Sequence, residues 1–277
     1  MSRGRRRLLQ ATAAVVAWPG GWRGASAADA PTTGERKVLR LLFSSAETTF
    51  DPARISDLYS RTVTSHIFEA LYTWDPLARP AKLRPVTAAG LPEPSSDFRV
   101  WTVRVTPGIF YADDPAFKGQ RRELVAQDYV YAFQRAVDPA NISPIEADVM
   151  DLKVVGLAAA REAAVKAKKP FDYDAPIDGL RATDRYTLRF SLENPNPRFP
   201  HTLAASDLLG GVAREVAQFY GDKIGEHPVG TGPFRLKSWR RSSRIVLERN
   251  PHYREVLYDA EPAADDAEGQ AILARLK

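Results

Sequence analysis

Residues 227–253 carry the pattern that most restricts what this chain can fold into. A Gly-Thr-Gly-Pro turn at 230–233 leads into one extended segment, a short polar turn at 240–243 reverses the chain, and a second segment alternates until Asn250-Pro251. Two such segments joined by a short polar turn predict a β-hairpin, and an Asn-Pro pair marks its end. The fold must therefore accommodate an antiparallel ribbon near the end of the sequence.

A strand, a loop and a helix are expected near the start. The apolar run at 38–43 is short and bounded by turn residues, which is typical of a buried strand. A polar loop follows at 44–52 and closes with Asp51-Pro52, and apolar residues at helical spacing predict a helix within 60–71. We expect this arrangement to present the polar groups of the loop at the edge of a cleft.

Between these regions the sequence predicts mixed helices and strands. Residues 76–94 contain five prolines and predict an irregular crossing with short extended pieces. Alternating side chains predict strands at 98–105, 109–111 and 186–192, whereas apolar spacing and composition predict helices at 126–137, 157–168, 213–220 and 268–276. The sequence therefore predicts helices and strands interspersed along the chain.

The net charge of +5 originates in the first 27 residues. That segment contains five arginines and no acidic residue, which leaves 34 basic and 34 acidic residues in the remainder. The main part of the chain therefore has no excess of positive charge, and we expect no nucleic-acid partner.

The same first 27 residues have the features of an export signal. A basic start precedes an apolar run at 8–18, and small residues lead up to Ala28, so we expect cleavage near Ala27. The pair Arg5-Arg6 leaves the twin-arginine and the general secretory routes open. The apolar run is shorter than the about 20 residues of a membrane span, so no membrane anchor is expected. The chain contains no cysteine, which excludes disulfides and a lipid-modified cysteine and favours a periplasmic location.

Catalytic and metal-binding motifs are not recognisable. The four histidines, at 66, 201, 227 and 252, show no i, i+4 spacing, and the chain has no Gly-x-Ser-x-Gly motif. Gly230-Thr231-Gly232 lacks the third glycine of a dinucleotide site and the Lys-Ser/Thr pair of a phosphate loop. We therefore predict no catalytic residue, no metal ligand, no cofactor and no enzymatic activity.

Several segments, taken in order, resemble the family 5 extracellular solute-binding proteins, the peptide-type and nickel-type receptors of ABC importers. They are FDP at 50–52, FEALY at 68–72, VRVTPGIF at 103–110, AQDYVYAFQR at 126–135 and HPVGTGPF with IVLERNPHY within 227–253. The sequence departs from the family at 113–119, an insertion where many members have a short DGxPV turn.

The resemblance implies an α/β fold with a mixed sheet, namely a lobe of the type II periplasmic-binding-protein fold with an appended small α+β domain. Members of the family are longer and have two lobes, so the opposing lobe is expected to be missing from this sequence. The expected divisions are a signal peptide at 1–27, a first part of lobe I at 28–75, the small domain at 76–182, a second part of lobe I at 183–259 and a truncated tail at 260–277.

The resemblance also implies a function. The chain is expected to be a periplasmic, monomeric receptor that captures a peptide-like or other small polar solute by closure of a cleft and delivers it to a membrane ABC permease, in peptide or other transmembrane transport. The alternatives are a secreted hydrolase whose site converges from distant residues, and a non-functional fragment that needs a partner chain.

The residues that the resemblance assigns to the ligand cleft lie in two segments. They are Ser45, Glu47 and Thr48 in the first loop and Gly230, Thr231 and Gly232 before the hairpin. The carboxylate of Glu47 is the expected partner of a ligand ammonium group, while an ordinary solvated acid remains the alternative. The two glycines allow either close approach of a ligand or a tight entry into the strand.

Overall fold

The computed structural model describes residues 37–276. The chain divides into one unit that ends at Leu42 and a second unit that begins at Phe43. The predicted export signal, with its cleavage site near Ala27, lies outside the described residues.

Residues 37–42 form neither helix nor strand, and their apolar side chains are exposed, namely Val38, Leu39, Leu41 and Leu42. The predicted buried strand at 38–43 is therefore wrong. An apolar run supplies side chains for burial, but a strand also needs partners for its main-chain N–H and C=O groups, and no described strand pairs with this segment.

The larger unit contains a four-stranded antiparallel sheet in the order β3-β4-β6-β5. Its strands are β3 (Glu93–Pro94), β4 (Val100–Arg104), β5 (Leu180–Ala182) and β6 (Thr187–Ser191). Trp101 faces Phe190 across β4 and β6, and Val103 faces Leu188, so alternate side chains build one buried face. This alternation confirms the strands predicted around 98–105 and 186–192.

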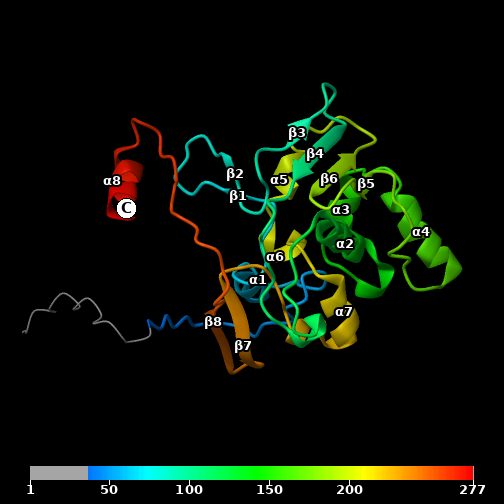
Figure 1. Cartoon of the computed structure of the whole chain (residues 1–277), viewed down its shortest axis with the longest axis horizontal. Coiled ribbons are helices and arrows are strands. Elements are labelled where there is room, and N and C mark those ends of the chain that lie inside the picture. The colour runs from blue at the N-terminus through cyan, green and yellow to red at the C-terminus, as the bar shows by residue number, and fades with distance from the viewer. Residues whose placement is uncertain (1–36, 277) are drawn as a thin grey trace, which may run out of the picture. The chain divides into compact units, whose positions relative to one another are not determined.

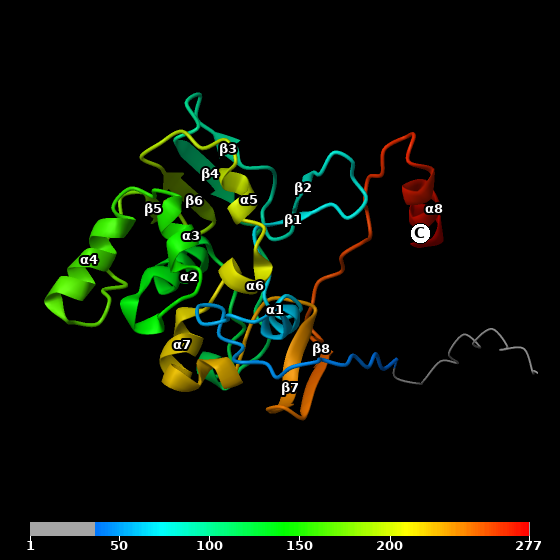
Figure 2. The same ribbon diagram turned by 180° about the vertical axis from the view of Figure 1, so that it is seen from behind.

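Helix α2 (Ala126–Val137) packs on the buried face of this sheet and confirms the predicted helix at 126–137. The carboxylate of Asp128 accepts a hydrogen bond from the main-chain N–H of Val125, which satisfies a free donor at the start of the helix. The rings of Phe133 and Phe190 lie 5.4 Å apart between helix and sheet. Figures 1 and 2 both show α2 beside the four strands.

The remaining elements are short. They are the ribbon of β1 (Tyr72–Trp74) and β2 (Leu83–Pro85), and the helices α3 (Glu146–Asp151), α4 (Leu157–Ala167), α5 (Phe199–Thr202), α6 (Ser206–Leu209), α7 (Arg214–Tyr220) and α8 (Ala267–Leu276). The helices predicted at 157–168, 213–220 and 268–276 are thus confirmed. Residues 109–111 form only a single bridge, between Phe110 and Glu123, instead of the predicted strand.

The predicted hairpin is confirmed as β7 (Phe234–Arg240) and β8 (Arg244–Arg249). Its apolar side chains pack on a second buried cluster that contains Phe50, Val63 and Phe68. Figures 1 and 2 show the hairpin beside α1 (Leu58–Thr64).

The predicted helix at 60–71 is shorter than expected and begins earlier. Asp57 caps α1, and the helix ends at Thr64 because the next carbonyl groups have other partners. The carbonyl oxygen of His66 accepts from the N–H of Phe234, and that of Ile67 accepts from the N–H of Gly232. Hydrogen bonds to Gly232 and Phe234 at the start of the hairpin therefore take the place of the helical hydrogen bonds that the prediction implied for these two carbonyl groups.

The predicted division between residues 182 and 183 falls inside the four-stranded sheet. Strand β6 lies after this position, yet it pairs with both β4 and β5, which lie before it. The domain limits stay a prediction. A limit between residues 182 and 183 would divide this sheet.

Candidate functional site

The first group of predicted site residues lies on the loop before α1. The main-chain N–H of Thr48 donates to the carboxylate of Asp57 at 3.1 Å and to the hydroxyl of Ser60 at 3.0 Å. Asp57 also accepts from the N–H of Ser60 at 2.8 Å, so one carboxylate caps the helix and holds the loop. Ser45 and Thr48 are exposed, and the side chain of Ser45 forms no hydrogen bond with any described residue.

Two opposed effects set the pKa of Asp57. Burial raises its pKa, but the hydrogen bonds from Ser60 and Thr48 together outweigh burial and lower the pKa below its ordinary value of 3.8. Asp57 is therefore ionised at neutral pH, and the loop is fastened to a charged acceptor.

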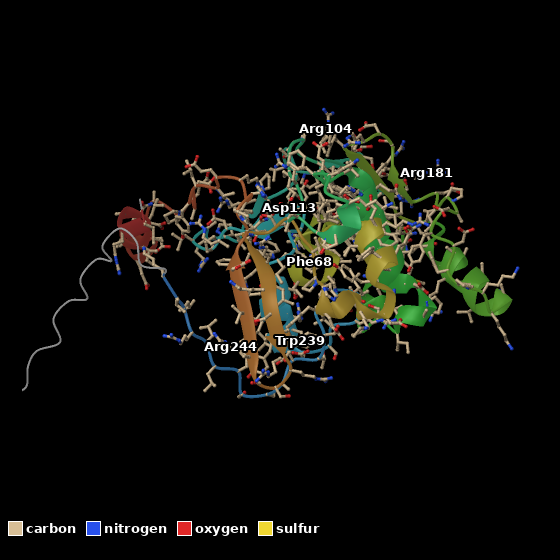
Figure 3. All side chains as sticks on the ribbon, turned by 60° about the horizontal axis from the view of Figure 1, so that its bottom comes forward. Phe68, Arg104, Asp113, Arg181, Trp239 and Arg244 are labelled. Carbon is tan, nitrogen blue, oxygen red and sulfur yellow. The ribbon has the colours of Figure 1, made fainter. Side chains whose placement is uncertain are left out.

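Glu47 is buried, with 4 % of its surface exposed. Its Oε1 atom accepts hydrogen bonds from the indole N–H of Trp239 and from the main-chain N–H of Ser242, at 3.2 Å for the latter. Its Oε2 atom has no hydrogen-bond partner among the described residues. Figure 3 labels Trp239 on β7 and Arg244 on the facing strand β8. Glu47 thus fastens the loop to the turn end of the hairpin, a contact that the sequence analysis did not foresee.

The glycines at 230 and 232 lie against the end of α1. A Cβ atom on Gly230 would lie 2.0 Å from the carbonyl oxygen of Ile67, and one on Gly232 would lie 2.6 Å from that of His66. Neither glycine has a positive φ. Of the two roles considered for these glycines, close main-chain packing at the strand entry is the one the geometry accounts for.

Thr231 belongs to a buried polar network around Glu69. Its hydroxyl donates to Oε2 of Glu69 at 2.9 Å, and the guanidinium of Arg254 donates to both carboxylate oxygens at 2.7 and 3.0 Å. Tyr253 donates its hydroxyl to Oε1 at 3.0 Å, and burial, together with the charge of Glu69, raises the pKa of Tyr253 to about 12. The carboxylate therefore receives four hydrogen bonds.

Glu69 and Arg254 were missed as site residues by sequence reasoning. The signal that was available is the glutamate within FEALY: an acidic residue among apolar helix positions is rarely buried without a partner. The partner follows 185 positions later in the sequence, and no local pattern indicates which arginine it is.

The six predicted residues do not lie together in one pocket. Thr48 is held by the first turn of α1, whereas Gly230 and Gly232 pack against its end. Glu47 contacts the turn end of the hairpin and Gly232 precedes β7, so the seven residues of this strand separate the two groups by about 20 Å, at about 3.3 Å per residue. The predicted residues thus form two ends of a strip rather than a single pocket.

Two of the hollows on the larger unit differ in their relation to the predicted residues. One, of about 260 Å³, has Thr231 in its wall together with residues of the 108–121 loop and of the segment after β8. The other, of about 510 Å³, lies over β3, β4 and β6 and contains none of the predicted residues. Within residues 37–276 no three His, Asp or Glu side chains gather into a possible metal site. In that same part of the chain, no helix is long and apolar enough to cross a membrane.

Known proteins share this architecture. The crystal structure of Haemophilus influenzae OppA in complex with RPPGFSPFR is similar with a TM-score of 0.60 and 28 % sequence identity, over 75 % of this chain and 37 % of that chain. The chain has part of the type II periplasmic-binding-protein fold.

Sequence comparison agrees with the fold. The periplasmic oligopeptide-binding protein OppA of Salmonella typhimurium is 28 % identical over 236 residues, which are 83 % of this chain and 39 % of that protein. Di/tripeptide-binding protein 2 of Pseudomonas aeruginosa is 28 % identical over 253 residues, which are 87 % of this chain and 42 % of that protein. The chain thus spans about two fifths of the length of these relatives.

The sequence model of "Bacterial extracellular solute-binding proteins, family 5 Middle" matches residues 82–272. The chain belongs to the family 5 bacterial extracellular solute-binding proteins. The family predicted from the sequence is thereby confirmed.

Proposed function

We propose that this protein is a solute receptor of an ABC importer, which captures a peptide-like or other small polar solute in the periplasm and delivers it to a membrane permease without breaking a bond. Family membership carries this proposal. The names of the similar proteins support a peptide as the solute, because one is an oligopeptide-binding protein and another a di/tripeptide-binding protein.

The proposed ligand-binding residues are Ser45, Glu47, Thr48, Gly230, Thr231 and Gly232. Two kinds of unused group support their assignment. Oε2 of Glu47 has no partner among the described residues, and the same holds for the main-chain N–H groups of Gly230 and Thr231. The N–H groups of buried residues are normally paired, so those of Gly230 and Thr231 are candidates for bonds to a ligand. Oε2 of Glu47 is an acceptor that no described donor uses.

The length of the strip suits a short peptide. An extended peptide rises by about 3.3 Å per residue, so a separation of about 20 Å corresponds to roughly six residues. In this arrangement Glu47 accepts the ammonium group at one end, and the N–H groups of Gly230 and Thr231 donate to carbonyl or carboxylate oxygens towards the other.

The proposed mechanism is closure of a cleft. A receptor of this kind gains affinity when its ligand is enclosed from two sides and water is excluded. This chain spans about two fifths of its relatives, so we expect it to bind a peptide by itself in the millimolar rather than the micromolar range.

The test compares trialanine with N-acetyl-trialanine, which lacks the ammonium group, by calorimetric titration of the full chain. We expect trialanine to bind more tightly, and Glu47→Gln to remove this difference while an amide oxygen still accepts from Trp239. Glu226→Gln, at an exposed position without a hydrogen bond to any described residue, is the matched control. Equal affinities of the two peptides for the unmodified chain would contradict the role of Glu47.

A further inference from the structure

The hollow of about 260 Å³ beside the Gly-Thr-Gly segment has a composition that the proposed receptor function does not explain. Its wall consists of Gly108, Ile109, Phe110, Arg121, Thr231, His252, Tyr253 and Arg254. It is small for a whole drug-sized ligand, since such pockets usually have about 300 to 1,000 Å³. Its volume is large enough for one end of a ligand.

Arg121 is the cation in this wall that is available to a ligand. Its guanidinium carbon lies 4.0 Å from the centre of the Phe110 ring, a cation–π contact that positions the group. Among the described residues no carboxylate lies within ion-pair distance of Arg121, although the following residue, Arg122, is paired with both Asp128 and Glu215.

The acidic groups next to the hollow are already engaged. Glu69 receives four hydrogen bonds, from Thr231, Tyr253 and Arg254. Asp113, which Figure 3 labels, lies 3.0 Å from Nε2 of His252. No acidic residue contributes to the wall itself, so an incoming anion meets the charge of Arg121 without a competing carboxylate there.

Thr231 adds a second donor. Its side chain is hydrogen-bonded to Glu69, but its main-chain N–H has no acceptor among the described residues. Only 3 % of the surface of Thr231 is exposed. A buried N–H group without a partner is costly, and a bound oxygen atom relieves that cost.

We infer that this hollow is a carboxylate subsite in which the guanidinium of Arg121 and the N–H of Thr231 hold the carboxylate of the solute. This inference rests on the proposed receptor function and adds the orientation of the ligand. A guanidinium binds the two oxygens of a planar carboxylate in parallel, and Ile109 and Phe110 offer apolar surface to the attached carbon atoms. The carboxylate lies at the Thr231 end of the strip and the ammonium group at the Glu47 end.

The insertion at 113–119 adjoins this subsite. Only Gln120 lies between the insertion and Arg121, and Asp113 within the insertion contacts His252 in the wall of the hollow.

The test is an NMR titration of the full chain with trialanine, trialanine amide and acetate. We expect trialanine and acetate to shift the amide signal of Thr231 and the Nε–H signal of Arg121, and trialanine amide to leave both unchanged. If trialanine shifts these two signals and acetate does not, the ligand is a peptide carboxylate. If both shift the signals equally, the subsite accepts any small carboxylic acid. Either outcome supports the subsite.

Variants separate the role of Arg121 from general charge. Arg121→Ala should weaken trialanine binding about tenfold, the loss of one charge-assisted hydrogen bond, and Arg121→Lys should weaken it less. Arg189→Ala, which removes an exposed arginine on β6 that pairs with no described carboxylate, should leave the affinity unchanged.

Three outcomes overturn the subsite: equal shifts with trialanine and its amide, unchanged binding to Arg121→Ala, or no shift at Thr231 with 20 mM of any probe. If trialanine then shifts signals only around Glu47, the receptor function stands and the subsite fails. If acetate binds but trialanine binds no better, the subsite stands and the peptide assignment fails.

Discussion

The carboxylate of Asp51 and the guanidinium of Arg135 form two parallel hydrogen bonds, of 2.8 and 2.9 Å, between the loop before α1 and the middle of the molecule. Both side chains are buried, and they stand 84 positions apart. Burial lowers the pKa of Arg135, but Asp51 outweighs burial and raises it, so Arg135 stays charged. This pair fixes the loop that carries the predicted ligand-binding residues onto α2.

We predict that Asp51→Asn lowers the free energy of unfolding by about 3 to 5 kcal/mol, because it leaves a buried guanidinium without its counter-charge. Urea unfolding followed by circular dichroism measures the loss. Lys166→Ala, which breaks the exposed pair with Glu162 on α4, is the control and should cost less than about 0.5 kcal/mol. A loss for Asp51→Asn no larger than that of the control would show that the pair does not hold the loop.

Gly230→Ala should destabilise the fold by roughly 1 to 3 kcal/mol, since the added Cβ would lie 2.0 Å from the carbonyl oxygen of Ile67 and the main chain has to move. Gly90→Ala is the matched control, because nothing lies within 4 Å of its Cβ position. Thermal unfolding of both variants compares them directly. If Gly230→Ala is as stable as Gly90→Ala, the close packing of the hairpin entry against α1 is not rigid.

The pH dependence of stability should contain a contribution from Asp57. Its pKa in the folded chain is lowered, so its contribution is present above its ordinary pKa of 3.8 and is lost as the pH falls through the lower folded value. Asparagine also caps helices, so Asp57→Asn keeps the helix start while it removes the titration.

Unfolding free energies of the unmodified chain and of Asp57→Asn, measured from pH 7 to pH 3, provide the comparison. The difference should be constant above about pH 5 and shrink below that, where the aspartate becomes protonated. A difference that stays constant down to pH 3, or grows, would show that Asp57 is not stabilised as a charged group.

The sequence predicted the elements whose side chains repeat regularly. The alternation through Trp101 and Val103 and the apolar spacing of Tyr129 and Phe133 depend only on local periodicity, so β4 and α2 were located correctly. The hairpin was predicted from its turn residues and the Asn250-Pro251 stop for the same reason.

Other features depend on contacts between distant parts of the chain. The run at 38–43 has the composition of a strand, but pairing is a property of two segments and not of one. The partners of Glu47 are Trp239 and Ser242, almost 200 positions away, so no local pattern assigns its carboxylate to the hairpin turn. The predicted site residues are those that the family resemblance implies, whereas the hollow around Arg121 is formed by segments more than 100 positions apart, which no local pattern indicates.

The most direct test of the account is a map of amide chemical-shift changes across the full chain during titration with a soluble peptide of about six residues, which is long enough to reach both ends of the strip. The account predicts that the signals of Glu47, Thr48, Gly230 and Thr231 shift together and saturate at one dissociation constant, as expected when one ligand occupies both ends of the strip. Shifts confined to other surfaces, or two groups of signals that saturate at different concentrations, would contradict a single solute-binding site along the strip.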